Sequence, residues 1–125
     1  MILIHFSGEP MTTILLSADL MIASQFAGAA MRQQVKLFTV GDADGLLEKQ
    51  AESGAKLVVI DLTLAGLEPS DLVQSLRILP NPPARILAFG PHVQVGLLDS
   101  ARQAGCDEVV ARSQFHSSMD EIIGS

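Results

Sequence analysis

The stretch KLVVIDLTLAGLEPSDL, residues 56–72, decides the fold. Five residues that suit a buried strand (56–60) lead directly into an acid, Asp61, and then into further apolar residues. An unbroken apolar run is typical of a strand in a parallel sheet that helices cover on both faces. A carboxylate at the end of such a strand is costly unless its charge is used, so Asp61 is the first candidate for a functional residue.

Working outward, four more runs resemble strands, and helical spacing separates them. The strand-like runs are residues 13–17, 35–40, 85–89 and 107–111, and the helical stretches are residues 20–34, 44–53, 70–79, 93–104 and 117–123. Gly54 and Gly105 are predicted to end two of the helices, and Ser70 to cap the start of another. Strict alternation of strand and helix gives a parallel sheet with right-handed crossovers. We therefore predict an α/β, flavodoxin-like, doubly wound sheet of five strands in the order 2-1-3-4-5, with helices on both faces.

Composition narrows the class of protein. A chain of 125 residues suits one domain, and its net charge of −6 argues against a nucleic-acid surface, which needs clustered Lys and Arg. The single cysteine, Cys106, excludes an internal disulfide and a Cys-rich zinc site, and fits a reducing cytoplasm. The sequence is 48% hydrophobic, with a mean hydropathy of +0.36. Either a sheet covered on both faces or an apolar partner surface explains that value.

Two segments near the N-terminus need separate interpretations. Residues 11–31 hold one charge, Asp19, over a membrane-spanning length, but they also contain five Ser, Thr and Gln residues. No Lys or Arg precedes Arg32, so no basic region of a signal peptide is present, and we expect a strand and a helix outside the membrane. Residues 1–10 are predicted to be an N-terminal extension, either an added edge strand or the product of a mis-assigned start, before a domain of residues 11–125.

The candidate site follows from the topology. Ligands bind open parallel sheets at the carboxyl ends of the strands, where strand order reverses. We expect Asp19, after the first strand, to converge there with Asp61, and Arg112 to lie nearby. Two close acids repel each other, and Mg²⁺ relieves such repulsion by binding their oxygens. The simpler alternatives stay open: Asp19 as the N-cap of a helix, and Arg112 as an ion-pair partner of Asp19 or Asp61.

These residues carry a resemblance to response-regulator receiver domains, which covers residues 11–123. The segment LVVIDLTLAG is similar to the family's apolar strand, phospho-accepting Asp and following loop, and AGCDEVVARSQF is similar to its AGADDYLxKPF segment. The resemblance implies that Asp61 is the phospho-acceptor position, that Asp19 and Asp61 bind Mg²⁺, and that Arg112 takes the place of the family's lysine. It also implies attack of the Asp61 carboxylate on a phosphoryl group.

The departures from the family pattern predict a weakened site. The family's pair of acids after the first strand reads Ala18-Asp19 here, so one charge of the metal site is missing. Its hydroxyl after the fourth strand falls at Gly90, and its aromatic switch residue falls at Val109. The lysine-proline pair reads Arg112-Ser113. We therefore expect weak Mg²⁺ binding, weak or absent phosphorylation of Asp61, and loss of most of the switch.

The predicted function is a stand-alone, cytoplasmic, receiver-like module of a two-component-type phosphorelay. It is not an enzyme, and it acts through contact with a histidine kinase, phosphotransfer or output protein. The fourth helix, the fifth strand and the last helix are the expected docking face, with a homodimer as one use of it, because Val93, Val95, Leu97 and Leu98 exceed one helical face. The alternatives are a small-ligand-binding flavodoxin-like domain and a ligand-free structural interaction domain.

Overall fold

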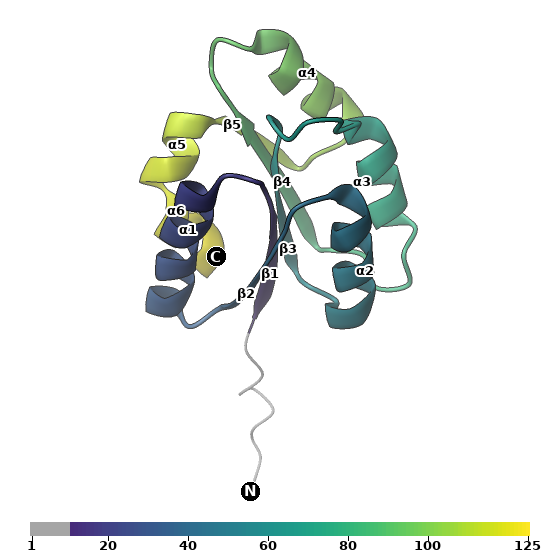
Figure 1. The fold of residues 1–125 in the computed structure, drawn as a ribbon. Helices are drawn as coiled ribbons and strands as arrows, with labels where there is room; N and C mark the ends of the chain where they lie inside the picture. The colour runs from purple at the N-terminus through teal and green to yellow at the C-terminus, as the bar shows by residue number, and fades with distance from the viewer. Residues whose placement is uncertain (1–10) are drawn as a thin grey trace, which may run out of the picture.

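Five strands alternate with helices along the chain in the computed structural model, which describes residues 11–125 (Figure 1). The strands are β1 (Thr12–Leu16), β2 (Lys36–Val40), β3 (Leu57–Asp61), β4 (Arg85–Gly90) and β5 (Glu108–Ala111). The helices are α1 (Leu20–Gln33), α2 (Ala43–Ser53), α3 (Pro69–Arg77), α4 (Val95–Ala104), α5 (Arg112–Ser117) and α6 (Met119–Gly124). The expected extension or extra strand in residues 1–10 lies outside the described residues.

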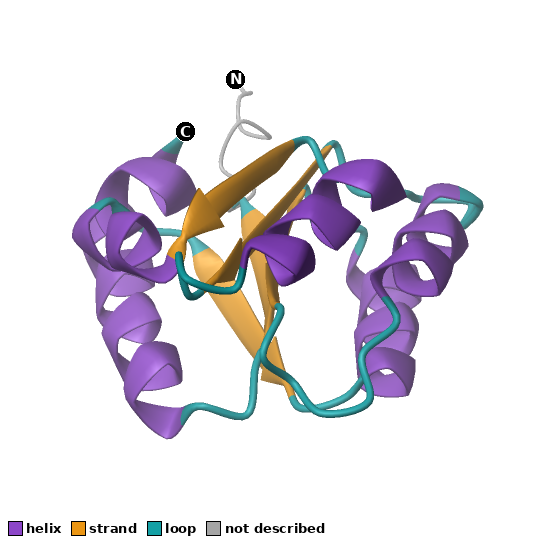
Figure 2. Ribbon diagram, turned by 90° about the horizontal axis from the view of Figure 1, so that it is seen from above, coloured by secondary structure: helices purple, strands orange, loops and turns teal. Residues whose placement is uncertain are grey.

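All strand pairs are parallel, and the sheet order is β2-β1-β3-β4-β5. Helices α1, α5 and α6 cover one face of the sheet, and α2, α3 and α4 cover the other (Figure 2). This arrangement confirms the predicted fold class and strand order. Because β1 and β3 are adjacent and the chain proceeds outward from them in opposite directions, their carboxyl ends form the point where strand order reverses.

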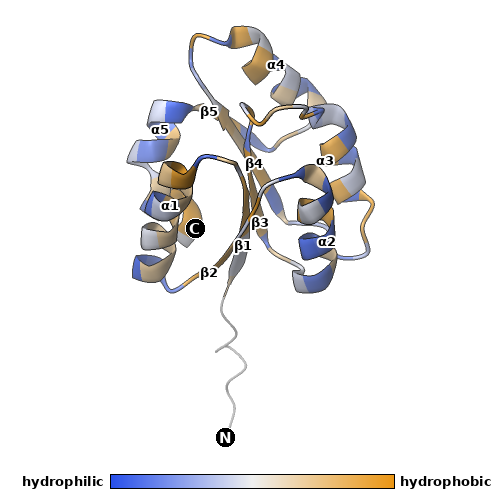
Figure 3. Ribbon diagram, in the orientation of Figure 1, coloured by the Kyte–Doolittle hydropathy of each residue, from blue (hydrophilic) through white to orange (hydrophobic). Residues whose placement is uncertain are grey.

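Each central strand contributes to two cores, which is why the strands read as unbroken apolar runs. Alternate residues of β1, β3 and β4, such as Ile14, Ile60 and Ile86, pack against α2, α3 and α4. The residues between them pack against α1, α5 and α6. Hydropathy coloured on the ribbon shows the apolar centre of the sheet between the two helical layers (Figure 3). The high apolar content is therefore used largely inside the domain.

Three phenylalanines form the centre of the second core. Phe115 of α5 stacks on Phe89 of β4 with a centroid distance of 4.3 Å and an angle of 2° between the ring planes. Phe26 of α1 packs against the Phe115 ring in a tilted arrangement, with a centroid distance of 5.1 Å. All three side chains are fully buried. The cluster ties the short helix α5 to α1 and to the sheet.

Several predicted helix boundaries are confirmed and others are wrong. Gly54 and Gly105 cap α2 and α4 in the left-handed conformation, as expected. Helix α3, however, begins at Pro69 after Glu68, so Ser70 is not its N-cap. Helix α4 starts at Val95 rather than at residue 93. The last helix, predicted over residues 117–123, corresponds to α6, and a separate short helix, α5, precedes it and ends at Ser117.

Within residues 11–125, no helix combines the length and the apolar character needed to cross a membrane. Residues 11–31, which raised that question in the sequence, form β1 and most of α1 instead.

Candidate functional site

Asp61 is the last residue of β3, and its side chain is 2% exposed. Its carboxylate accepts three hydrogen bonds. The Ser17 hydroxyl donates to Oδ2 at 2.7 Å, while the backbone N–H and the hydroxyl of Thr63 donate to Oδ1 at 3.0 and 2.7 Å. The buried acid is therefore stabilised by hydroxyl and amide donors of its own chain.

Ser17 connects the two candidate acids. Its hydroxyl donates to Asp61 and accepts the backbone N–H of Asp19 at 3.1 Å. Ser17 follows β1 directly and is buried, so its side chain, rather than that of Asp19, is the group from this segment that hydrogen-bonds Asp61. Sequence reasoning missed this residue, although it is the first polar residue after the apolar run of β1.

Asp19 caps α1 and forms an ion pair with Arg112. One carboxylate oxygen accepts the backbone N–H groups of Met21 and Ile22 at 3.0 and 3.1 Å, and the other accepts from the Arg112 guanidinium. Arg112 is the first residue of α5, and its guanidinium also lies over the Phe89 ring, 5.9 Å from the centroid. The structure thus shows Asp19 as an N-cap and Arg112 as its ion-pair partner, the two alternatives that the sequence left open.

The pKa of Asp19 lies below its ordinary value, because the backbone N–H of Ile22 hydrogen-bonds the carboxylate and the Arg112 guanidinium lies beside it. We expect Arg112→Gln to raise the pKa of Asp19 only part of the way back, since the helix N–H groups remain. A carboxyl pKa depressed by folding adds stability above the unfolded value, and that stability is lost as the pH falls through the folded value. In the variant the loss should therefore be smaller, and it should be complete at a higher pH. An NMR titration of the Asp19 carboxyl carbon checks this, and a full return or an unchanged pKa would contradict it.

Gly90 and Val109, which take the places of the family's switch hydroxyl and switch aromatic, have apolar surroundings in the structure. Gly90 ends β4, and a Cβ built there would lie 3.5 Å from the side chains of Leu62 and Leu98. Val109 of β5 is half-buried against the core on the α2–α4 side of the sheet. The hydroxyls that reach Asp61 come from Ser17 and Thr63 instead.

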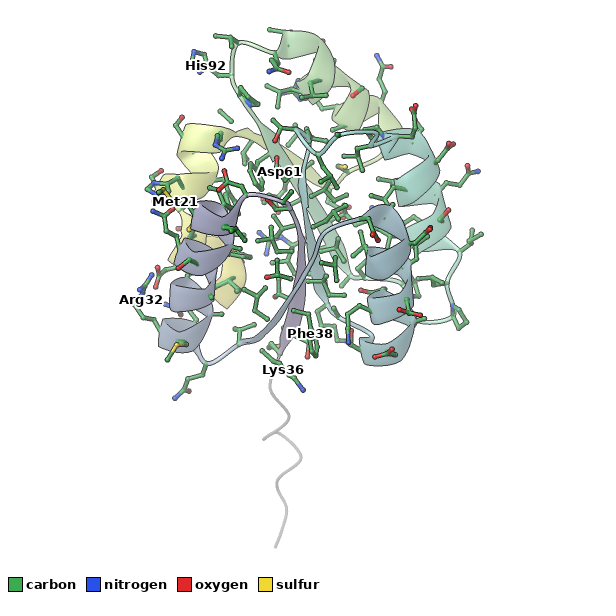
Figure 4. The ribbon with its side chains drawn as sticks, viewed as in Figure 1. Met21, Arg32, Lys36, Phe38, Asp61 and His92 are labelled. Atoms are coloured by element: carbon green, nitrogen blue, oxygen red, sulfur yellow. The ribbon has the colours of Figure 1, made fainter. Side chains whose placement is uncertain are left out.

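A cavity of about 480 Å³ opens beside the Asp19–Arg112 pair. Its walls come from the start of α1, the loop between β4 and α4, and α5, and the residues lining it include Met21, Ile22, Pro91, His92 and His116. In Figure 4, Asp61 lies at the end of the sheet, and Met21 of α1 and the loop that carries His92 both lie to the left of it. The edge of the sheet that holds the candidate site is therefore bordered by a mostly apolar hollow.

Cys106 lies apart from this edge of the sheet, in the segment between α4 and β5. Burial raises the pKa of its thiol to about 11, so the thiol stays protonated near neutral pH. In this environment Cys106 behaves as a small apolar residue.

The chain resembles known proteins in its fold rather than in its sequence. No model of a protein family matches the sequence, and no curated protein matches it. Among solved structures, a response-regulator receiver domain from Bermanella marisrubri is 17% identical with a TM-score of 0.79, over 92% of this chain and 96% of that one. A response regulator from Hahella chejuensis is 14% identical with a TM-score of 0.78, over 90% and 92% of the two chains.

The receiver domain of a sensor histidine kinase from Pseudomonas aeruginosa is 15% identical with a TM-score of 0.75, over 94% of this chain and all of that one. That structure is described with a magnesium ion coordinated in its active-site cleft. These likenesses confirm the predicted resemblance at the level of the fold: the chain has the fold of response-regulator receiver domains.

Proposed function

We propose that this chain is a receiver-like, cytoplasmic signalling module of a two-component-type phosphorelay. It acts through contact with a kinase, phosphotransfer or output protein and has no enzymatic activity of its own. The observation that carries the proposal is Asp61, a buried acid at the carboxyl end of β3 in a receiver-type fold, whose hydrogen-bonding needs the chain itself meets.

Phosphorylation of Asp61 is proposed to be weak or absent. A nucleophilic carboxylate needs a free oxygen lone pair directed at the phosphoryl donor. Here Oδ1 accepts twice from Thr63, which occupies both of its lone pairs, and Oδ2 accepts once from Ser17. Only one lone pair of Oδ2 is left for attack, and the Ser17 hydrogen bond lowers the nucleophilicity of that oxygen. Arg112, at the lysine-equivalent position, is already paired with Asp19 and would have to leave that pair to contact a phosphoryl oxygen.

The residues at the site fit a magnesium ion poorly. Mg²⁺ prefers octahedral oxygen ligands and is held in proteins chiefly by carboxylates. The Asp19 carboxylate is occupied by helix N–H groups and by Arg112, and the Asp61 carboxylate by Ser17 and Thr63. Among residues 11–125, no three His, Cys, Asp or Glu side chains are grouped so as to hold a metal ion. We propose that Mg²⁺ binds at Asp19 and Asp61 only weakly.

Docking on a protein is supported by exposed apolar side chains at the same edge of the sheet. Val93 and Val95, in and after the loop that leads to α4, are 72% and 60% exposed. Of the other two residues in the expected docking face, Leu98 is buried and Leu97 is half-buried against the core. The first two residues therefore remain available for a partner, next to the cavity beside Asp19.

Treatment with beryllofluoride or acetyl phosphate in millimolar Mg²⁺ tests the proposal. We expect backbone NMR shifts around residue 61 to change little, because the Asp61 oxygens are already hydrogen-bonded. Asp61→Asn is the control and should give the same small response. A stoichiometric acyl phosphate on the native protein, with large shifts that the variant lacks, would replace the proposal with an ordinary phospho-switch.

The cavity favours a second candidate function, the binding of a small ligand. Its lining combines apolar side chains with the Asp19–Arg112 ion pair and two histidines, and a largely apolar wall with a few polar groups is the kind of lining that holds a small molecule. A small molecule that copurifies with the native protein would favour this function, provided that its removal shifts the NMR signals of Met21 and of the residues next to Pro91. If Asp61→Asn binds a protein partner as well as the native chain does, and no ligand is bound, the ligand-free structural alternative is favoured.

A further inference from the structure

Asp61 has two hydroxyl partners, and only one of them is exposed to solvent. Ser17, directly after β1, is 5% exposed and donates to Oδ2, whereas Thr63 is exposed in the loop after β3 and donates to Oδ1. Both of these hydrogen bonds are 2.7 Å long. A protein that docks at this edge of the sheet can therefore contact the Thr63 side chain directly, while the Ser17 side chain lies beneath the surface.

The Thr63 hydroxyl can leave Asp61 while the backbone of the loop stays in place. The Thr63 N–H is held at 3.0 Å from Oδ1 by a turn in which the Leu64 N–H donates to the Asp61 carbonyl oxygen at 3.2 Å. The hydroxyl, in contrast, is positioned by rotation about the Cα–Cβ bond. Since the N–H and the hydroxyl fill both lone pairs of Oδ1, one rotamer change of Thr63 frees one of them.

The loop itself offers the Thr63 hydroxyl no charged acceptor besides Asp61. Residues 62–67 carry neither a charged side chain nor a second hydroxyl, so a competing acceptor has to come from outside the loop. Close approach is possible there, because Ala65 and Gly66 are small and exposed, and a Cβ built at Gly66 would have open space around it. The surroundings of Thr63 thus suit contact with the backbone of another protein.

We propose that the Thr63 hydroxyl is an inhibitory contact, which keeps Asp61 weakly reactive in the free chain and lies where a docked protein can release it by offering another acceptor. The inference rests on the proposed function, since it presupposes that Asp61 of the free chain is phosphorylated weakly or not at all. Thr63 is then a positioning residue, because it acts on the phosphoryl group only through Asp61.

Release of the hydroxyl raises the reactivity of the whole carboxylate. A hydrogen bond to a carboxylate stabilises its negative charge, and resonance shares that charge between Oδ1 and Oδ2. Loss of the Thr63 bond therefore makes both oxygens better nucleophiles, and it adds a free lone pair on Oδ1. In the step itself, an Asp61 oxygen forms a bond to the phosphorus of the donor. The bond between phosphorus and the donor's leaving group breaks, and the leaving group keeps the electron pair.

Thr63→Val tests the contact, because valine keeps the shape of threonine and the backbone N–H but has no hydroxyl. Each protein is incubated with acetyl phosphate in millimolar Mg²⁺, and the phosphorylated chain is measured by intact-protein mass spectrometry before and after treatment with hydroxylamine, which removes acyl phosphates. We expect the initial rate of acyl phosphate formation to rise about tenfold, the lower end of what a hydrogen bond to a charged group contributes. Thr63→Ser, which restores the hydroxyl, should return the rate to the native level.

Two further variants are controls. Thr39→Val removes an exposed hydroxyl from the edge strand β2, and it should leave the rate unchanged. Asp61→Asn/Thr63→Val should give no acyl phosphate, which identifies Asp61 as the group that reacts. Circular dichroism confirms that each variant is folded.

The outcomes separate this inference from the proposed function. If the native chain reacts weakly and Thr63→Val reacts no faster, the inhibitory contact is excluded and the proposed function stands. If Thr63→Ser reacts as fast as Thr63→Val, the hydroxyl is not the cause, and the inference fails in the same way. A native chain that is phosphorylated stoichiometrically would overturn both, because Asp61 would then be reactive with the contact in place.

Discussion

Phe115→Ala is expected to lower the free energy of unfolding by about 3–5 kcal/mol, the usual cost of removing a fully buried phenylalanine. The ring stacks on Phe89 at 4.3 Å and meets Phe26 at 5.1 Å, so its loss leaves a cavity bounded by two other rings. A domain of this size has a total stability of about 5–15 kcal/mol. The variant should therefore unfold at a much lower urea concentration, measured by far-UV circular dichroism.

Phe38→Ala provides a matched comparison. Phe38 lies on the edge strand β2 next to Lys36 (Figure 4) and is half-buried. The ammonium groups of Lys36 and Lys49 lie over its ring, 5.1 and 4.6 Å from the centroid. Water can fill the space left by this half-buried ring, whereas the space left by Phe115 stays an empty cavity. The loss of stability should therefore be clearly smaller than that for Phe115→Ala. Equal losses in the two variants would contradict the assignment of the three-ring cluster as the centre of the second core.

The strands and their order were predictable because the signal is physical and local. Residues 57–60 and 86–89 are buried on both faces, and this burial is written in the sequence as unbroken apolar runs. Gly54 and Gly105 marked helix ends for an equally local reason, the left-handed backbone that each adopts. Helix α5 was not predicted, because Ala111 precedes it without a side-chain cap and Phe115 is its only buried residue.

The site was predictable in position but not in its contacts. The topology placed Asp61 at the carboxyl edge of the sheet, and it placed Asp19 and Arg112 on the same edge. Which side chain hydrogen-bonds Asp61 depends on rotamers, which a pattern of residue types does not specify. Thr63, two residues after an acid, carried the sequence signal of a local side-chain-to-backbone turn, and that signal could have identified one of the three donors. Ser17 could be identified only as a polar residue at the end of an apolar strand.

Ser17→Asp is expected to make the stability of the protein depend on magnesium. The Ser17 hydroxyl lies 2.7 Å from Asp61, so an aspartate at position 17 replaces a hydrogen bond with two carboxylates in contact. At neutral pH without a metal, the variant should lose about 3 kcal/mol of stability, the scale of an uncompensated buried charge. Millimolar Mg²⁺ should recover part of that loss, because a hard cation takes both carboxylates as oxygen ligands and stabilises the folded state by mass action. Thermal unfolding with Mg²⁺ and with a chelator measures both effects.

Ser17→Ala and pH separate charge from the loss of a hydrogen bond. Ser17→Ala removes the donor without adding charge, so we expect a smaller loss of about 1–3 kcal/mol that Mg²⁺ does not change. In Ser17→Asp, one of the two adjacent carboxyls should have a raised pKa in the folded state, so its deficit should shrink as the pH falls and that carboxyl is protonated. If the native protein gains as much from Mg²⁺ as Ser17→Asp does, then Asp19 and Asp61 already form an effective cation site. In that case the Ser17 hydroxyl would not be the reason for weak Mg²⁺ binding at this site.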